Sequence, residues 1–221
     1  MGNRPEAADP LVWEELSTEH LVQDEWIDFR KSTYRLPDGA IFSPFYTYTR
    51  RNYVVIVATD PDGNYICVRQ FRQGIRQVTV EFPAGGIEQS DPAEDEATSQ
   101  ADASDQRNDA VAAASQGYVI DSSEIQALAA AKRELLEETG YESDAWEHLL
   151  TVPSDATVCD NYAHLFAARN CRRVSGQNLD ETEFLNVELH SEDEIEDLIA
   201  KGGFQQCVHI TAWLLARRQK G

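Results

Sequence analysis

The distribution of apolar residues along the chain first indicates a set of buried strands. Residues 53–58 form a continuous apolar run, typical of a central strand that is buried on both faces. A turn at 60–64 separates this run from an apolar-rich partner at 65–72, and residues 78–82 form a further strand. Strands are also expected at 146–152, 162–168 and 184–189. These segments supply the core strands of a large domain over residues 51–221.

Residues 1–50 show a weaker pattern and form a separate N-terminal part. Segment 21–31 has part of the alternation of a strand, and segment 41–48 returns as a second strand. Pro37 and Gly39 mark the turn between them, because proline presets φ and glycine permits positive φ. Residues 20–50 therefore predict an antiparallel pair of strands, preceded by a polar, loosely held leader at 1–20.

Residues 92–123 interrupt the domain with a low-complexity acidic insertion. Alanine, serine, aspartate, glutamate and glutamine dominate this segment, and bulky apolar residues are few. Such a composition favours disorder or a loosely attached excursion. Ser123, followed three residues later by Gln126, resembles a capping box that starts the next helix. A second capping box, Ser191 with Glu194, predicts a helix to about residue 200.

The helix after the insertion carries the most informative polar pattern. Its apolar face has i, i+3, i+7 spacing: Leu128, Ala131 and Leu135. Glu134, Glu137 and Glu138 project together from another side of the last turns. Like charges at this spacing repel by roughly 0.2–0.5 kcal/mol per pair, and the helix dipole disfavours them further. Three carboxylates on one face suit a hard divalent cation, Mg²⁺ or Mn²⁺. The alternative is a solvated acidic face.

Composition and charge limit the kinds of molecule that the protein is expected to bind. The 221 residues carry a formal net charge of −20, which repels nucleic acid and anionic membranes. A diphosphate would be repelled as well, so a site for one needs local cations. We find no apolar run long enough to span a bilayer. The four cysteines lack CxxC spacing, which argues against zinc and disulfides and favours the reducing cytoplasm.

Two segments carry a resemblance to a known family. Residues 133–141, RELLEETGY, match the second half of the Nudix hydrolase signature, and residues 81–88, EFPAGGIE, resemble the entry to it in the ADP-ribose and nucleoside-diphosphate-sugar pyrophosphatase branch. The resemblance extends over about residues 26–215. It implies an α/β Nudix fold, an α/β/α sandwich with a mixed sheet. It also implies an N-terminal antiparallel sheet that forms part of a homodimer and of the nucleoside pocket.

The resemblance also implies roles for individual residues. The expected metal ligands are Ala84, through its backbone carbonyl, Glu134, Glu137 and Glu138. The expected catalytic residues are Glu137, Glu183, Glu181 and Arg133, with Glu183 ranked above Glu181 as base, and Arg133 orienting the metal ligands by pairing with Glu137. The expected substrate-binding residues are Trp26, Arg72, Glu81 and Phe45.

Each of these assignments has a plain structural alternative. Trp26 could be a strand tryptophan packed on its neighbours, and Arg72 a surface ion-pair residue. Glu81 could be an ordinary carboxylate at a strand end, and residues 180–183 a solvated acidic turn. His164, which stands alone in a buried strand, favours a structural role.

The insertion separates the two halves of the signature. Gly85 lies 48 positions before Arg133, so about 34 residues interrupt the motif. The first-half glutamate of the signature consequently has no clean equivalent. Asp91 has the right spacing from Gly85, and Glu124 lies one residue away from the right spacing before Arg133. Either acid, or neither, could serve.

The function implied is Mg²⁺- or Mn²⁺-dependent hydrolysis of ADP-ribose or a related nucleoside diphosphate sugar, giving AMP (or another NMP) and a sugar phosphate. A GDP- or UDP-sugar is an alternative, because a stacking tryptophan does not distinguish adenine from guanine. A Nudix-like sensor that binds a nucleotide without cleaving it is another alternative. The three intact glutamates of the helix argue against it. The remaining alternative is an acidic protein that only binds other proteins and has no catalytic activity.

Overall fold

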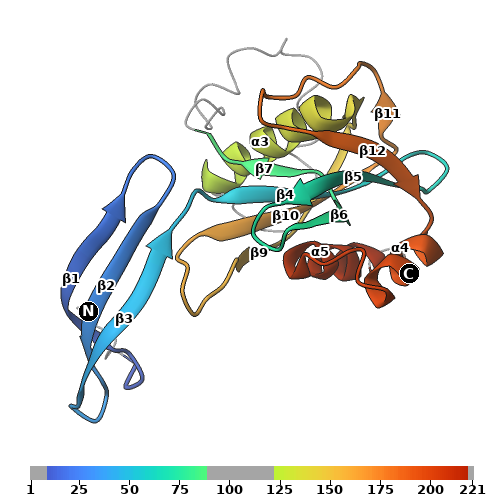
Figure 1. Ribbon diagram of the computed structural model, residues 1–221. Helices are drawn as coiled ribbons and strands as arrows, with labels where there is room; N and C mark the ends of the chain where they lie inside the picture. Colours follow the sequence, from blue (N-terminus) through green and yellow to red (C-terminus); the bar gives the residue numbers. More distant parts are fainter. Residues whose placement is uncertain (1–8, 89–121, 219–221) are drawn as a thin grey trace. The chain divides into compact units, whose positions relative to one another are not determined.

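The computed structural model describes residues 9–88 and 122–218, and divides the chain into two units (Figure 1). The first unit comprises residues 1–51 and 153–161, and the second comprises residues 52–152 and 162–221. The sequence placed 153–161 in a loop of the large domain and did not indicate that it joins the N-terminal unit. Most of the predicted insertion at 92–123, with Asp91, lies outside the described residues.

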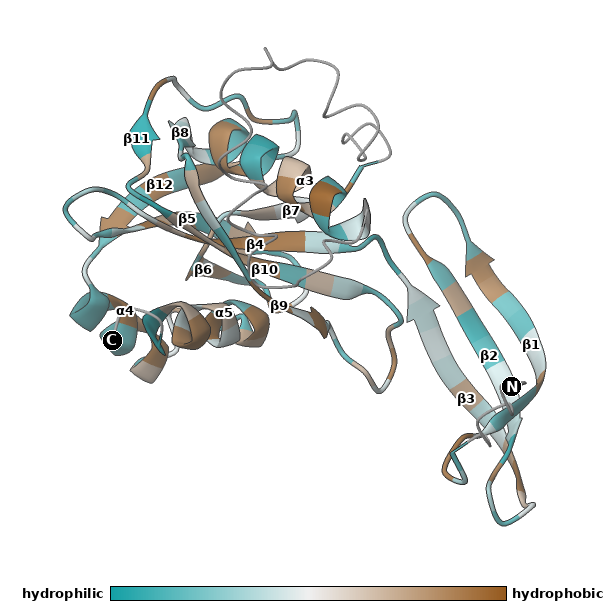
Figure 2. Ribbon diagram, turned by 180° about the vertical axis from the view of Figure 1, so that it is seen from behind, coloured by the Kyte–Doolittle hydropathy of each residue, from teal (hydrophilic) through white to brown (hydrophobic). Residues whose placement is uncertain are grey.

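The first unit is built on a three-stranded antiparallel sheet. Its order is β1 (Glu14–Gln23), β2 (Asp28–Arg35), β3 (Ile41–Thr49). The prediction of two strands after a polar leader was wrong for β1. Nine of its ten residues are exposed, so the strand is held by backbone pairing with β2 and shows no hydrophobic periodicity. Hydrophilic residues are frequent along β1 and β2 (Figure 2).

The second unit contains a seven-stranded mixed sheet of order β12-β5-β4-β10-β9, in which β6 also pairs with β5 and β7 with β4. The central pair, β4 and β10, is parallel, whereas β5, β6, β7 and β12 make antiparallel pairs. The strands are β4 (Tyr53–Thr59), β5 (Tyr65–Arg72), β6 (Gln77–Glu81), β7 (Ala84–Gly86), β9 (Ala145–Pro153), β10 (Tyr162–Arg169) and β12 (Leu185–His190). A separate short pair joins β8 (Tyr141–Glu142) to β11 (Arg172–Arg173).

Helices cover both faces of this sheet (Figure 1). Helix α3 (Ser122–Thr139) packs on one face, and α4 (Glu192–Ala200) and α5 (Cys207–Arg218) lie on the other. Alternate residues of β4 separate the two cores: Val54 and Ile56 pack with α3, and Val55 and Val57 pack with α5. The predictions of an α/β/α sandwich with a mixed sheet, and of a central strand buried on both faces, are confirmed.

The two predicted capping boxes had different outcomes. Ser191 accepts the backbone N–H of Glu194, whose side chain accepts the N–H of Ser191, as expected at the start of α4. Helix α3 instead begins at Ser122, so Ser123 lies inside its first turn. The helix thus starts one residue before the predicted cap. Gln126 donates from Nε2 to the Glu88 carbonyl at 3.0 Å. None of the described helices has the length and apolar character needed to cross a membrane.

Candidate metal and catalytic site

Arg133 links the acidic end of α3 to strand β7. Its Nη1 donates to Glu134 Oε1 at 2.8 Å and to Glu137 Oε2 at 3.0 Å. Its Nη2 donates to the Gly86 carbonyl at 3.0 Å. The predicted pairing of Arg133 with Glu137 one turn further on is confirmed. A guanidinium that bridges two carboxylates and a strand carbonyl fixes the direction in which the helix presents its acids.

Glu138 is a buried carboxylate with one strong backbone donor. Its side chain is almost fully buried, and Oε2 accepts the N–H of Ala84 at 3.0 Å. Burial raises the pKa of Glu138 well above its usual range, and the charges of Glu134 and Glu183 raise it further. The Ala84 N–H and the charge of Arg72 act in the opposite direction without cancelling the effect. The carboxylate therefore lacks sufficient positive charge around it.

Glu134 lies in a similar environment one turn earlier. The residue is 8% exposed, and burial raises the pKa of its carboxyl to about 7 even though Arg133 is hydrogen-bonded to it. Its carboxylate lies directly against Gly85, where an added Cβ would be only 2.0 Å from the carboxyl carbon. The absence of a side chain at Gly85 is thus what allows the Glu134 carboxylate to approach the backbone of β7.

The carboxylates of Glu134 and Glu138 fit a hard divalent cation, because its charge would stabilise two buried carboxylates with raised pKa values. The described residues contain no group of three His, Cys, Asp or Glu side chains already gathered for a metal. Glu137, the third predicted carboxylate, is held by Arg133. Its participation would require exchange of that ion pair for a metal bond.

Residues 174–178 cap the C-terminal end of α3. The helix has no basic residue in its last turn, so its carbonyl groups need other donors. The N–H of Asn178 donates to the Glu137 carbonyl at 2.8 Å, and Gln177 Nε2 donates to the Glu138 carbonyl at 2.8 Å. The N–H of Val174 donates to the Gly140 carbonyl at 2.9 Å. The sequence carries no local signal for this capping role.

The same loop carries both candidates for the catalytic base. The charge of Glu183 raises the pKa of Glu134 and of Glu138, so its carboxylate lies near the pair. Glu183 Oε2 also accepts the N–H of Asp180 at 3.1 Å, which orders the turn. Glu181 is exposed to solvent. The ranking of Glu183 above Glu181 as catalytic base stays a prediction.

Arg72 and Glu81 form a buried ion pair. Nε of Arg72 lies 3.0 Å from both carboxylate oxygens of Glu81, and Nη2 lies 2.5 Å from Oε2. Glu81 is fully buried. The two residues lie on the neighbouring strands β5 and β6, where Arg72 pairs with Gln77 and Glu81 pairs with Val68. The ion-pair alternative for Arg72 is thus the one observed, although its partner is buried and not on the surface.

Glu124 does not join the acidic group of α3. Its Oε1 lies 3.4 Å from Nδ1 of His148 on β9. It precedes Glu134 by ten residues, or about 15 Å along the helix. His148 Nε2 lies 3.0 Å from Thr151 Oγ1, which in turn lies 3.1 Å from Nδ1 of His164. Burial lowers the pKa of His164, in line with its predicted structural role.

The predicted nucleoside-binding aromatics lie in the first unit. Trp26 is 68% exposed, and Cζ of Arg51 lies 5.6 Å from the centre of its ring. The packed-tryptophan alternative therefore does not describe Trp26. Phe45 is half-buried and belongs to a cluster of edge-to-face rings with centroids 5.9–6.2 Å apart: Trp13, Tyr34, Phe42 and Phe45.

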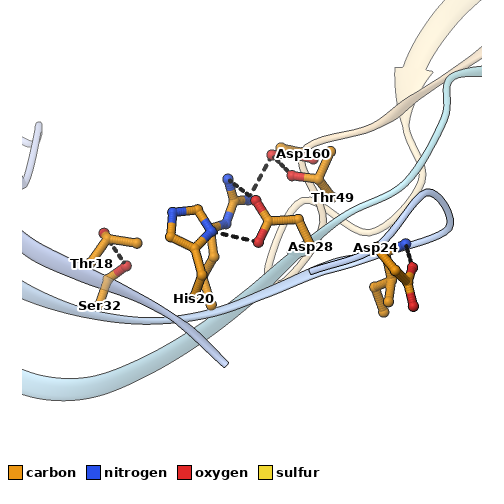
Figure 3. A network of polar contacts seen from close by, with 9 residues as sticks. Thr18, His20, Asp24, Asp28, Ser32, Thr49 and Asp160 are labelled. Atoms are coloured by element: carbon orange, nitrogen blue, oxygen red, sulfur yellow. Dashed lines mark hydrogen bonds and ion pairs between the residues drawn. The ribbon is translucent and has the colours of Figure 1, made fainter. Parts of the chain in front are cut away.

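A polar network next to these rings was not foreseen. Arg30 Nη2 donates to Asp160 Oδ2 at 2.7 Å, and Thr49 donates to the same oxygen at 2.6 Å (Figure 3). His20 Nδ1 lies 2.7 Å from Asp28. A cavity of about 400 Å³ lies between this face of the sheet and residues 156–160. The contact of Arg30 with Asp160 joins positions 130 residues apart, for which the sequence carries no local signal.

Comparisons with known proteins agree with this geometry. Residues 105–209, a little under half of the chain, match the family model described as the NUDIX domain. A methanol dehydrogenase activator from Bacillus methanolicus is 24% identical over 183 residues, covering 82% of this chain and 80% of that protein. A crystal structure of an ADP compounds hydrolase superposes with a TM-score of 0.70 at 17% identity, covering 94% of this chain and 93% of that one. The fold is the Nudix fold.

The contact between Gly85 and Glu134 yields a test with a matched control. Gly85→Ala should displace the Glu134 carboxylate and weaken Mn²⁺ binding by roughly tenfold or more, because the orientation of a ligand is then lost. Gly86→Ala should bind as the wild type does, since an added Cβ there meets nothing within 4 Å. Calorimetric titration with Mn²⁺ measures both. Equal affinities for the two variants would contradict the arrangement.

The uncompensated charge of Glu138 predicts that removing its carboxylate will stabilise the metal-free protein and weaken metal binding. In metal-free buffer at pH 8, Glu138→Gln should raise Tm by a few degrees, because a neutral amide replaces the buried carboxyl group. This rise corresponds to an increase in the free energy of unfolding on the order of 1–2 kcal/mol. The stabilisation of the protein by Mn²⁺ should be largely lost at the same time. Glu142→Gln, at an exposed position, is the control and should leave both quantities unchanged. A lower Tm for Glu138→Gln would contradict the charge imbalance.

Proposed function

We propose that this chain is a metal-dependent Nudix pyrophosphohydrolase that cleaves the diphosphate of ADP-ribose or a related nucleoside diphosphate sugar into a nucleoside monophosphate and a sugar phosphate. The observation that carries the proposal is the pair of buried carboxylates, Glu134 and Glu138, held against β7 by Gly85 and the Ala84 N–H. Such a pair is costly in a protein without a cation. An arrangement that concentrates negative charge in this way is suited to binding a divalent metal.

Each residue of the proposed site has a distinct task. Glu134, Glu137, Glu138 and the Ala84 carbonyl would hold Mg²⁺ or Mn²⁺, which would neutralise the charge of the diphosphate. Arg133 orients the carboxylates of Glu134 and Glu137 through its hydrogen bonds to both. Glu183, on a loop anchored to α3, would accept a proton from the attacking water. Arg72 and Glu81, which the resemblance implies as substrate-binding residues, bind each other and would support the site through this ion pair.

The nucleoside would be held by the first unit. Trp26 offers an exposed ring, and stacking of an aromatic ring on a base is worth about 1–3 kcal/mol by analogy with nucleic-acid sites. Phe45 would contribute through its aromatic cluster. The ADP compounds hydrolase with the same fold favours an adenine nucleotide, although GDP- and UDP-sugars stay in the test. Intact Glu134, Glu137 and Glu138 disfavour a sensor that does not cleave.

The proposal includes a homodimer and a cytoplasmic location. The first unit exposes several large apolar residues that a second copy could cover: Leu11, Val12, Trp13, Ile41, Phe42 and Tyr46. All four cysteines are free, as in a reducing compartment. Neither nucleic acid nor a membrane is a proposed partner, because of the net charge of −20.

The function is tested by incubating the wild type with Mg²⁺ or Mn²⁺ and a panel of ADP-ribose, ADP-glucose, GDP-mannose, UDP-glucose, NADH and diadenosine polyphosphates. We expect an ADP-sugar to be cleaved fastest, with release of AMP measured by chromatography. Glu138→Gln should reduce the rate at least a hundredfold, since it removes a metal ligand. Silence across the panel together with measurable nucleotide binding would replace the hydrolase with the sensor.

Trp26→Ala tests the nucleoside contact. Loss of stacking should raise KM for the preferred substrate by about 5- to 150-fold, which corresponds to about 1–3 kcal/mol, while kcat changes little. Tm should hardly change, because the ring is 68% exposed. Leu214→Ala, at a half-exposed position on α5, is the control for loss of exposed apolar surface. An unchanged KM would remove Trp26 from the site.

A further inference from the structure

The chain crosses between two strands of the sheet immediately before the proposed site. Strands β4 and β5 pair directly at Ala58↔Ile66 and Thr59↔Tyr65. Beyond that point β6 pairs with β5 and β7 pairs with β4. The residues between β6 and β7, Phe82 and Pro83, therefore pass from one strand ladder to the other and leave both. Backbone groups at such a crossing need partners outside the ladders.

Two backbone groups at this crossing have identified partners, and the Phe82 side chain packs in the core. The Pro83 carbonyl accepts the N–H of Ile56 at 2.9 Å. The ring of Phe82 packs in the core, with its centroid 5.1 Å from that of Phe204. The N–H of Phe82 donates to Nδ1 of His209 at 3.2 Å. That nitrogen belongs to the third residue of α5, on the face of the sheet opposite α3.

We propose that His209 is a positioning residue for the metal site: by accepting the Phe82 N–H it fixes the backbone that presents Ala84 to Glu138. The path is short. Phe82 is two residues before Ala84, whose N–H donates to the buried carboxylate of Glu138 and whose carbonyl is a proposed metal ligand. The inference rests on the proposed function for its effect on turnover, but not for its effect on metal binding.

The acceptor role defines the state of the imidazole. Nδ1 must carry a lone pair, so the neutral ring holds its proton on Nε2. His209 is 4% exposed, and burial lowers the pKa of His209 to about 3, with the charge of Arg72 acting in the same direction. The ring consequently remains an acceptor throughout the neutral range, and the support of Phe82 does not depend on pH there.

Two polar substitutions separate this role from simple packing. In His209→Asn the side-chain oxygen can occupy the place of Nδ1 and accept the Phe82 N–H. In His209→Gln the amide lies one bond further out, near the place of Nε2. The measured quantity is the Mn²⁺ midpoint, the Mn²⁺ concentration that gives half of the full rise in Tm. For His209→Asn this concentration should stay within about threefold of wild type. For His209→Gln it should increase about tenfold or more, as is typical when contacts that support metal ligands are removed.

Trp213→Phe, a core change on the same helix, controls for general destabilisation: it should lower Tm without moving the Mn²⁺ midpoint. In hydrolysis, His209→Gln should need about tenfold more Mg²⁺ for half-maximal rate, with kcat at saturating Mg²⁺ largely retained. Equal Mn²⁺ midpoints for Asn and Gln would overturn the proposal, as would a wild type whose Tm does not respond to Mn²⁺. A wild type that binds Mn²⁺ and cleaves nothing would refute only the hydrolase.

Discussion

The structure of the second unit depends on the cost of placing buried negative charge at the negative end of a helix. Glu134 and Glu138 lie on the last turns of α3, where the dipole favours cations, and both are almost fully buried. The surroundings offset this cost only in part, through Arg133, the Ala84 N–H and the donors of residues 174–178. The remaining imbalance appears as raised pKa values at both carboxyls. Binding of a divalent cation would supply the missing charge, and would therefore stabilise the fold as well as create the reactive centre.

The partial compensation comes from every layer of the fold. Strand β7 supplies the Ala84 N–H and the open space at Gly85, and β5 supplies Arg72, whose charge reaches Glu138 while its hydrogen bonds go to Glu81. The loop before β12 caps α3 and carries Glu183. Helix α5 reaches the same region through His209 from the other face of the sheet. Carboxylates on a single helix would be poorly oriented, whereas contacts from these separate elements hold them at the strand crossover.

The features that the sequence predicted are those encoded locally. The acids and Arg133 fall within a short helical motif, and the apolar run of β4 is continuous, so both could be identified without knowledge of distant contacts. The cap of α4 needs only Ser191 and Glu194. The missed features depend on tertiary structure. Strand β1 is polar and exposed, and His209 meets Phe82 across 127 residues. Arg72 and Glu81 meet through their side chains, although the strand register pairs Arg72 with Gln77 and Glu81 with Val68. Glu124 was a reasonable candidate by spacing, yet the partner that holds it, His148, lies on β9.

The interruption of the signature lies where the domain can accommodate it. Glu88 and Gln126, on either side of residues 89–121, are joined by a hydrogen bond of 3.0 Å, so the two ends of the interruption lie together. Closing a longer connection between fixed ends costs little, about 0.6 kcal/mol for each doubling of its length. Glu134 follows the first residue of α3 by twelve positions, about 18 Å along the helix. The acids are grouped at the far end of α3, and Arg133 joins them to β7 through the Gly86 carbonyl, so contacts among the described residues hold the acids against this strand.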